Sequence, residues 1–267
     1  MSCPTPRLIL EFWYPPDLEP LRGLYSRGLL DAAFAPDLPF GAANADSLLA
    51  AWMAHSSGIP ALAAVSLGGR GAAASASRIA TAYASGLEGV VLVAGDARRS
   101  AGALGVLDAR GVLASLPRTP GGAGVPAVSA PLRVARREGG GFIEGAAADL
   151  QRDRSPGVAR GKVGAGANLF LSQLLDDPSG GVGALSSLSR LGVPVALGIP
   201  YAPTEGARAR LSSLLGIAAP SPADILKSLE KVPRDLRSPL YVSPIGSRSG
   251  LAEFLESLLS LLRRNSI

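Results

Sequence analysis

The chain has 267 residues, of which 47% are hydrophobic and 5% aromatic, and its formal net charge is +5 at pH 7. A single cysteine, Cys3, and a single histidine, His55, exclude a disulfide framework and argue against a Cys/His metal site. The few aromatic residues and the dispersed basic residues argue against nucleic-acid binding. With neither a signal peptide nor an apolar run long enough to span a membrane, we expect a cytoplasmic protein with no membrane partner.

Short apolar runs recur along the chain, and each ends in a polar or glycine-bearing turn. Buried parallel strands have this composition, because both of their faces are covered. The intervals between the runs suit one helix each. We therefore predict a single (β/α)₈ TIM barrel over residues 1–267.

The predicted elements of the first half begin with a strand at 7–12, which Pro15 and Pro16 end. The pattern then predicts a helix at 18–30, a strand at 31–34, a helix at 46–55, a strand at 61–67, a helix at 74–85 and a strand at 90–94. Residues 99–141 show no clear periodicity and are rich in glycine. We expect a long irregular excursion there, and a lid is one interpretation of it.

Regular alternation returns in the second half of the chain. The pattern predicts a strand near 141–145, a helix at 155–164, a strand at 168–172, a helix at 183–191, a strand at 193–199, helices at 205–215 and 223–231, a strand at 240–243 and a helix at 251–264. Eight strands with intervening helices can thus be counted, as a closed barrel of this type requires.

Polar residues at the carboxyl ends of these strands are the candidate site residues. Glu11 ends the first strand, Asp96 follows the fourth and Gln173 follows the sixth. Because all strand ends of a parallel barrel meet at one face, we expect the three side chains to surround one ligand. The glycine-rich turn at 68–71 suits either an anion-binding loop or an ordinary flexible turn. We expect His55, on a helix, to be structural.

Four segments resemble methylenetetrahydrofolate reductase. Residues 161–177, GKVGAGANLFLSQLLDD, are similar to the family's K-V-x-A-G-A-[ND] turn and the strand that ends in T-Q-[LF]-F-F-D. Residues 10–16, LEFWYPP, resemble F-E-F-F-P-P, and residues 86–96, GLEGVVLVAGD, resemble G-I-x-x-I-[VL]-A-L-R-G-D. Residues 195–200, VALGIP, are a weaker match to I-[IV]-P-G-I-[LM]-P. The chain departs from the family where it has SLGG at 66–69 instead of H-L-T-C.

The resemblance implies a flavin-dependent oxidoreductase of one-carbon metabolism that binds FAD, takes electrons from NAD(P)H or another donor, and reduces a methylene-pterin. By this resemblance Glu11 would assist protonation of the folate at N10, and Asp96 would lie beside the flavin and the pterin. Gln173 would hydrogen-bond to folate or nicotinamide. The folate, or a modified pterin, is thus the expected substrate.

The same resemblance implies cofactor contacts at Lys162, Gly68 and Ala167, with the lysine beside the flavin phosphates. An alternative is a barrel of the same ancestry without redox chemistry, which binds a pterin-like or phosphorylated ligand or serves as a subunit of a homo-oligomer or larger complex. A third interpretation is an aldolase- or isomerase-type barrel. No lysine lies at a strand end, which disfavours Schiff-base chemistry.

Overall fold

The computed structural model describes most of the chain, with gaps between the described segments. These segments are residues 5–13, 16–37, 45–67, 72–93, 141–150, 156–164, 166–216 and 218–263. The expected excursion at 99–141 therefore lies outside the described residues except for its last position.

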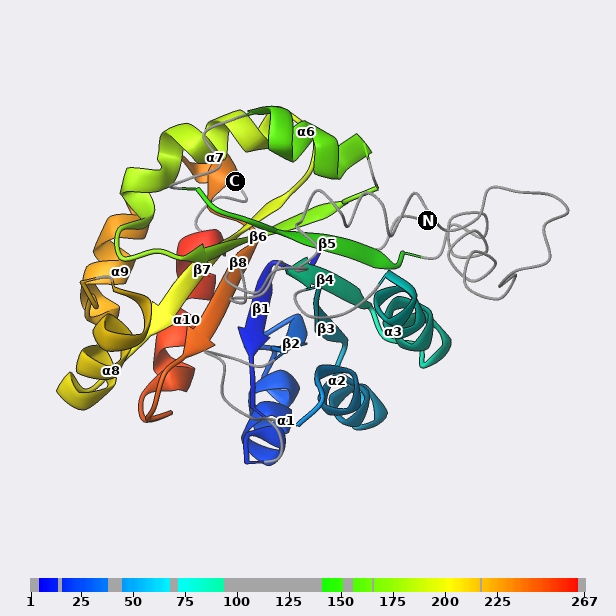
Figure 1. The fold of residues 1–267 in the computed structure, drawn as a ribbon. Coiled ribbons are helices and arrows are strands. Elements are labelled where there is room, and N and C mark those ends of the chain that lie inside the picture. Colours follow the sequence, from blue (N-terminus) through cyan, green and yellow to red (C-terminus); the bar gives the residue numbers. More distant parts are fainter. Residues whose placement is uncertain are drawn as a thin grey trace, which may run out of the picture.

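Eight parallel strands close into a barrel in which each strand pairs with its sequence neighbours and β8 pairs with β1. This confirms the predicted (β/α)₈ TIM barrel (Figure 1). The strands are β1 (Leu8–Glu11), β2 (Ala32–Ala35), β3 (Ala61–Ser66), β4 (Gly89–Val93), β5 (Ile143–Ala148), β6 (Leu169–Leu174), β7 (Val195–Tyr201) and β8 (Leu240–Pro244).

Helices surround the barrel (Figure 1). Those in the described segments are α1 (Leu18–Ser26), α2 (Ser47–Ser56), α3 (Ala72–Ala84), α6 (Pro156–Gly164), α7 (Val182–Ser189), α8 (Glu205–Leu215), α9 (Pro222–Leu229) and α10 (Leu251–Arg263), with 3₁₀ turns η2 (Pro178–Gly181) and η3 (Arg234–Leu236). None of these helices has the length and apolar character needed to cross a membrane.

The core has two layers, because alternate residues of each strand point to opposite faces of the sheet. Ile9, Leu62 and Tyr241 belong to the cluster that fills the barrel interior. Leu8 and Ala63 belong to the larger cluster between the sheet and the helices. Since both faces of every strand are buried, the strands appear in the sequence as uninterrupted apolar runs.

The predicted helix at 18–30 is four residues too long. Helix α1 ends at Ser26, and Gly28 follows with φ of +68°, a left-handed conformation that glycine adopts without strain. Leu29 and Leu30 are buried, so their apolar character reflects packing outside the helix. The periodic pattern could not distinguish apolar residues on a helix face from apolar residues that are buried after the helix has ended.

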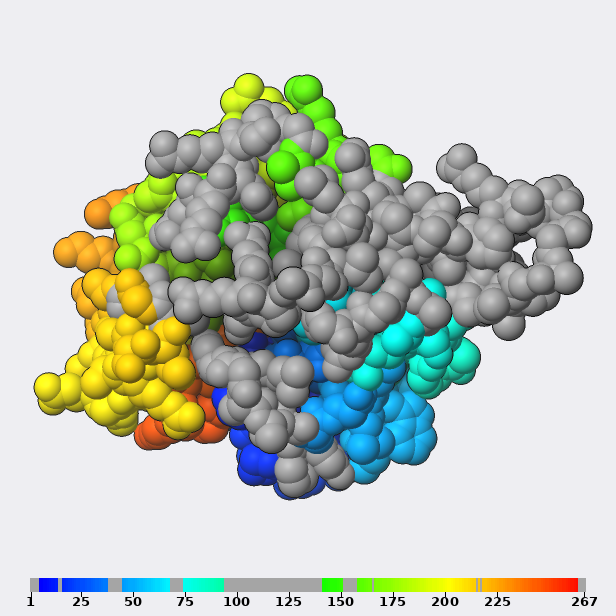
Figure 2. Space-filling view, in the orientation of Figure 1, coloured from blue at the N-terminus to red at the C-terminus, as the bar shows by residue number. Residues whose placement is uncertain are grey.

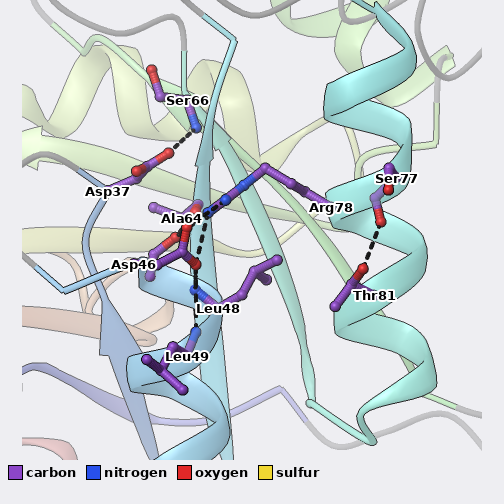
Figure 3. A network of polar contacts seen from close by, with 10 residues as sticks. Asp37, Asp46, Leu48, Leu49, Ala64, Ser66, Ser77, Arg78 and Thr81 are labelled. Atoms are coloured by element: carbon purple, nitrogen blue, oxygen red, sulfur yellow. Dashed lines mark hydrogen bonds and ion pairs between the residues drawn. The ribbon is translucent and has the colours of Figure 1, made fainter.

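A polar network joins the start of α2 to β3 and α3 (Figure 3). The Asp46 carboxylate accepts from the backbone N–H groups at the start of α2 and pairs with Arg78 of α3 at 2.6 Å. Ser47, fully buried, accepts from Arg78 at 2.9 Å and donates to the Ala64 carbonyl at 2.6 Å. This network ties two helices to the carboxyl half of β3.

In the space-filling view α2 and α3 lie beside one another on one flank, away from α8 (Figure 2).

Candidate functional site

The site begins with Glu11, the last residue of β1. Ile9, two residues earlier, lies in the interior cluster, so strand alternation directs Glu11 to the same interior face. Its side chain is only 6% exposed. An acidic group therefore stands at the carboxyl end of the barrel interior, where proteins of this fold place their active sites.

Three neutral donors surround the Glu11 carboxyl. The Trp13 indole Nε1 and the Ser243 hydroxyl each donate to Oε1 at 3.0 Å, and the Tyr241 hydroxyl donates to Oε2. Tyr241 and Ser243 alternate on β8, whose pairing with β1 places Tyr241 opposite Ile9. Both residues consequently face the interior beside Glu11. The donors around Glu11 thus come from β8, the neighbour of β1 in the closed barrel, and from Trp13, which follows β1.

Burial raises the pKa of Glu11 to about 7 from an ordinary value of 4.5, because desolvation disfavours the charged form. The hydrogen bonds from Trp13 and Ser243 and the positive charge of Arg248 oppose this rise, whereas the negative charge of Asp17 adds to it. A carboxyl with a pKa near 7 changes protonation state at neutral pH. It can therefore act as acid, base or hydrogen-bond acceptor there.

Gln173 lies inside β6 rather than after it. Its side-chain Oε1 accepts from the Leu150 backbone N–H at 2.8 Å, while its buried Nε2 has no hydrogen-bond partner among the described residues. The pairing of β6 with β7 shifts register between Leu171 and Leu174, which interrupts the alternation at Gln173. Within the described segments no hydrogen bond links Gln173 to Glu11, so only their common end of the barrel relates them.

The other expected site residues fall into two groups. Lys162 of α6 is buried and donates from Nζ to the Ala147 carbonyl at 2.7 Å. Ala167 is buried in the outer core cluster, where its backbone N–H donates to the Lys162 carbonyl. Asp96 and Gly68 lie outside the described residues.

Sequence reasoning missed Trp13, Tyr241 and Ser243. The rule that selected Glu11 would also have selected Ser243, a polar residue near the end of the last strand. Tyr241 gave no such signal, since an aromatic residue within a strand ordinarily indicates core packing. Across the parts of the chain that the structure describes, no group of three or more His, Cys, Asp or Glu side chains could hold a metal ion.

No family model matches the chain, and no curated protein sequence matches it. Solved structures do share its fold. Oxaloacetate acetylhydrolase in complex with the product oxalate has a TM-score of 0.58 at 16% identity, over 98% of this chain and 83% of that one. A 2,3-dimethylmalate lyase of the PEP mutase/isocitrate lyase superfamily has a TM-score of 0.57 at 16% identity, with the same coverage.

A third similar structure is an uncharacterized protein from Clostridium thermocellum that binds two copies of 5-methyl-5,6,7,8-tetrahydrofolic acid. Its TM-score is 0.55 at 13% identity, over 96% of this chain and 93% of that one. Identities this low show a common barrel fold and nothing finer about function.

The expectation of a methylenetetrahydrofolate reductase-like flavoprotein is wrong. The similar structures include PEP mutase/isocitrate lyase superfamily members rather than flavin oxidoreductases, and FAD and NAD(P)H have no support from them. Each matched segment contains all or part of an apolar strand of the barrel, and any parallel barrel has such apolar runs because its strands are buried on both faces. Lys162, expected beside flavin phosphates, instead contacts a backbone carbonyl of β5. The chain therefore shares a fold with these proteins, and the comparisons establish no family for it.

Proposed function

We propose that the chain is a barrel without redox chemistry that binds a pterin-like ligand at the carboxyl ends of its strands, with Glu11 as the recognition group. The observation that carries the proposal is the buried Glu11 carboxyl among neutral donors. A pterin ring presents adjacent N–H groups along one edge, and the three protein donors leave one lone pair on Oε2 of Glu11 that can accept from such a group.

Two further observations support this proposal. The Gln173 Nε2 group is buried and has no partner in the part of the chain that the structure describes, and an amide donor of this kind is costly unless something completes its hydrogen bonds. A pterin carbonyl or ring nitrogen would be a suitable acceptor. The Clostridium thermocellum protein, with the same barrel over nearly its whole length, binds a methylated tetrahydrofolate.

Acid–base catalysis on a small carboxylic acid is the second candidate function. The pKa of Glu11, raised to about 7 by burial, suits a general acid or base at neutral pH. The oxaloacetate acetylhydrolase and the dimethylmalate lyase, which share the fold, both act on such acids. Arg248, the cation that lowers the pKa of Glu11, is already paired with Asp17, and this favours the pterin over an anionic substrate.

Isothermal titration calorimetry at pH 7 separates the two functions. The probes are 5-methyltetrahydrofolate, oxaloacetate and inorganic phosphate, each added to wild-type protein and to Glu11→Gln. We expect binding of the pterin alone and a loss of affinity of about tenfold or more in Glu11→Gln, the equivalent of about 1.4 kcal/mol. Glu19→Gln removes a carboxyl that is 84% exposed and is the matched control.

Two results would overturn the pterin proposal. One is the absence of heat with 5-methyltetrahydrofolate while oxaloacetate binds and is consumed, an outcome that supports the second candidate. The other is pterin binding of equal strength in the wild type and in Glu11→Gln, which would place the ligand elsewhere on the molecule.

A further inference from the structure

An ion pair joins the loop after β1 to the loop after β8. The Asp17 carboxylate accepts from the Arg248 guanidinium at 2.5 Å, and the two side chains are 15% and 28% exposed. Arg248 also donates to the carbonyls of Pro244 and Gly246 at 3.0 and 3.1 Å. The guanidinium is therefore fixed on its own loop before it reaches Asp17.

Asp17 in turn holds Trp13 by two hydrogen bonds. Its carboxylate accepts from the Trp13 backbone N–H at 2.9 Å, and its own backbone N–H donates to the Trp13 carbonyl at 3.1 Å. The indole of Trp13 then donates to Glu11. A continuous chain of contacts thus runs from Arg248 through Asp17 and Trp13 to the buried carboxyl.

We propose that Asp17 and Arg248 form a clamp that positions the Trp13 indole against Glu11, so that the protonation of Glu11 and the position of the indole are coupled. In this arrangement Asp17 and Arg248 are positioning residues and do not touch the ligand. The relevance of the clamp to ligand binding rests on the proposed function, whereas the coupling itself is a property of the free protein.

The coupling can be tested by the direction in which each substitution shifts the pKa of Glu11. Tyr241 and Ser243 face Glu11 from β8 and Trp13 from the segment that follows β1, all as neutral donors. Among the described residues the charged groups that act on Glu11 are those of the clamp: Arg248 lowers its pKa and Asp17 raises it. If the charges acted alone, removal of Asp17 would lower the pKa of Glu11. If the clamp holds the indole, removal of either member releases Trp13 and raises this pKa, because the Trp13 hydrogen bond lowers it more than the Asp17 charge raises it.

Tryptophan fluorescence reports on this coupling without any ligand. The chain has two tryptophans, Trp13 and Trp52, and Trp52 is 44% exposed on α2. Trp52→Phe consequently leaves Trp13 as the single indole fluorophore. Because hydrogen bonds to a charged carboxylate are stronger than those to a neutral acid, the emission of Trp13 should change as Glu11 titrates. We expect one transition between pH 5 and 9 with its midpoint near 7, absent in Glu11→Gln.

The clamp variants, made in the Trp52→Phe background, decide the proposal. Arg248→Met and Asp17→Ala should both raise the midpoint, by about half a pH unit or more, because each releases the indole from Glu11. Arg248→Lys keeps the positive charge and should restore most of the wild-type midpoint. Arg7→Met is the matched control, since it breaks an ion pair with Asp31 at the opposite end of β1 and should leave the midpoint unchanged.

The proposal fails if Trp13 emission does not titrate, or if Asp17→Ala lowers the midpoint, which is the result expected of its charge alone. Far-UV circular dichroism of each variant shows whether it is folded, and Arg248→Lys provides a second test if Arg248→Met does not fold. If both clamp variants raise the midpoint but the pterin does not bind, the proposed function alone is overturned. The reverse combination would overturn the clamp alone.

Discussion

The buried carboxyl of Glu11 should make the protein less stable as the pH rises through neutrality. Burial raises its pKa from 4.5 to about 7, so the folded state holds a proton between these values that the unfolded chain releases. Stability falls with rising pH wherever the folded state binds more protons than the unfolded state. The contribution of protonated Glu11 is therefore fully present below about pH 4.5 and is lost as the pH rises to about 7. A difference of about 2.5 units at about 1.4 kcal/mol each gives a loss of about 3 kcal/mol from this residue.

Glu11→Gln removes the titration but keeps the size of the side chain and its ability to accept from Trp13 and Ser243. We expect the free energy of unfolding of this variant, relative to wild type, to rise by about 3 kcal/mol between pH 4.5 and pH 8. Urea denaturation followed by far-UV circular dichroism at five or more pH values measures this difference. Glu19→Gln controls for the loss of one negative charge. A difference between Glu11→Gln and wild type that stays constant with pH would refute the reasoning.

Other predictions concern the packing that holds the site. Gly198→Ala would place a Cβ 2.4 Å from the backbone oxygen of Gln173. We expect the free energy of unfolding, measured by urea denaturation, to fall by more than about 2 kcal/mol. A variant as stable as the wild type would contradict this close contact. Ser47→Ala removes one acceptor of Arg78 and the donor to the Ala64 carbonyl in a fully buried place, and should cost about 1–3 kcal/mol. A melting temperature unchanged by Ser47→Ala would show that this network contributes nothing to stability.

The architecture was predictable because the barrel buries both faces of every strand. The apolar runs at the first, third and seventh strands have no other simple explanation, and their order alone requires a parallel sheet with helical connections. The exact ends of the strands were harder to predict. The last strand residues depend on pairing with neighbours, so β7 extends to Tyr201, two residues beyond the predicted end.

The candidate site was predictable only in part. Glu11 follows from its place at a strand end, a rule that needs no knowledge of its neighbours. Its partners Tyr241 and Ser243 depend on the register between β1 and β8, which joins residues more than two hundred positions apart. Gln173 shows the same limit, because the register shift in β6 is not visible in the sequence.

The mistaken family assignment has a physical cause. The matched motifs lie in strands and turns, where any parallel barrel needs similar residue types. Barrels with different functions therefore share such motifs. The chemistry resides instead in individual side chains such as Glu11, and those must be read from the structure.

A crystal structure of the full chain with 5-methyltetrahydrofolate tests the central proposal most directly. We predict the pterin ring at the carboxyl ends of the strands, with its N–H edge within hydrogen-bond distance of the Glu11 carboxyl. Electron density for the pterin at another surface, or an empty strand-end face at saturating ligand, would contradict the account.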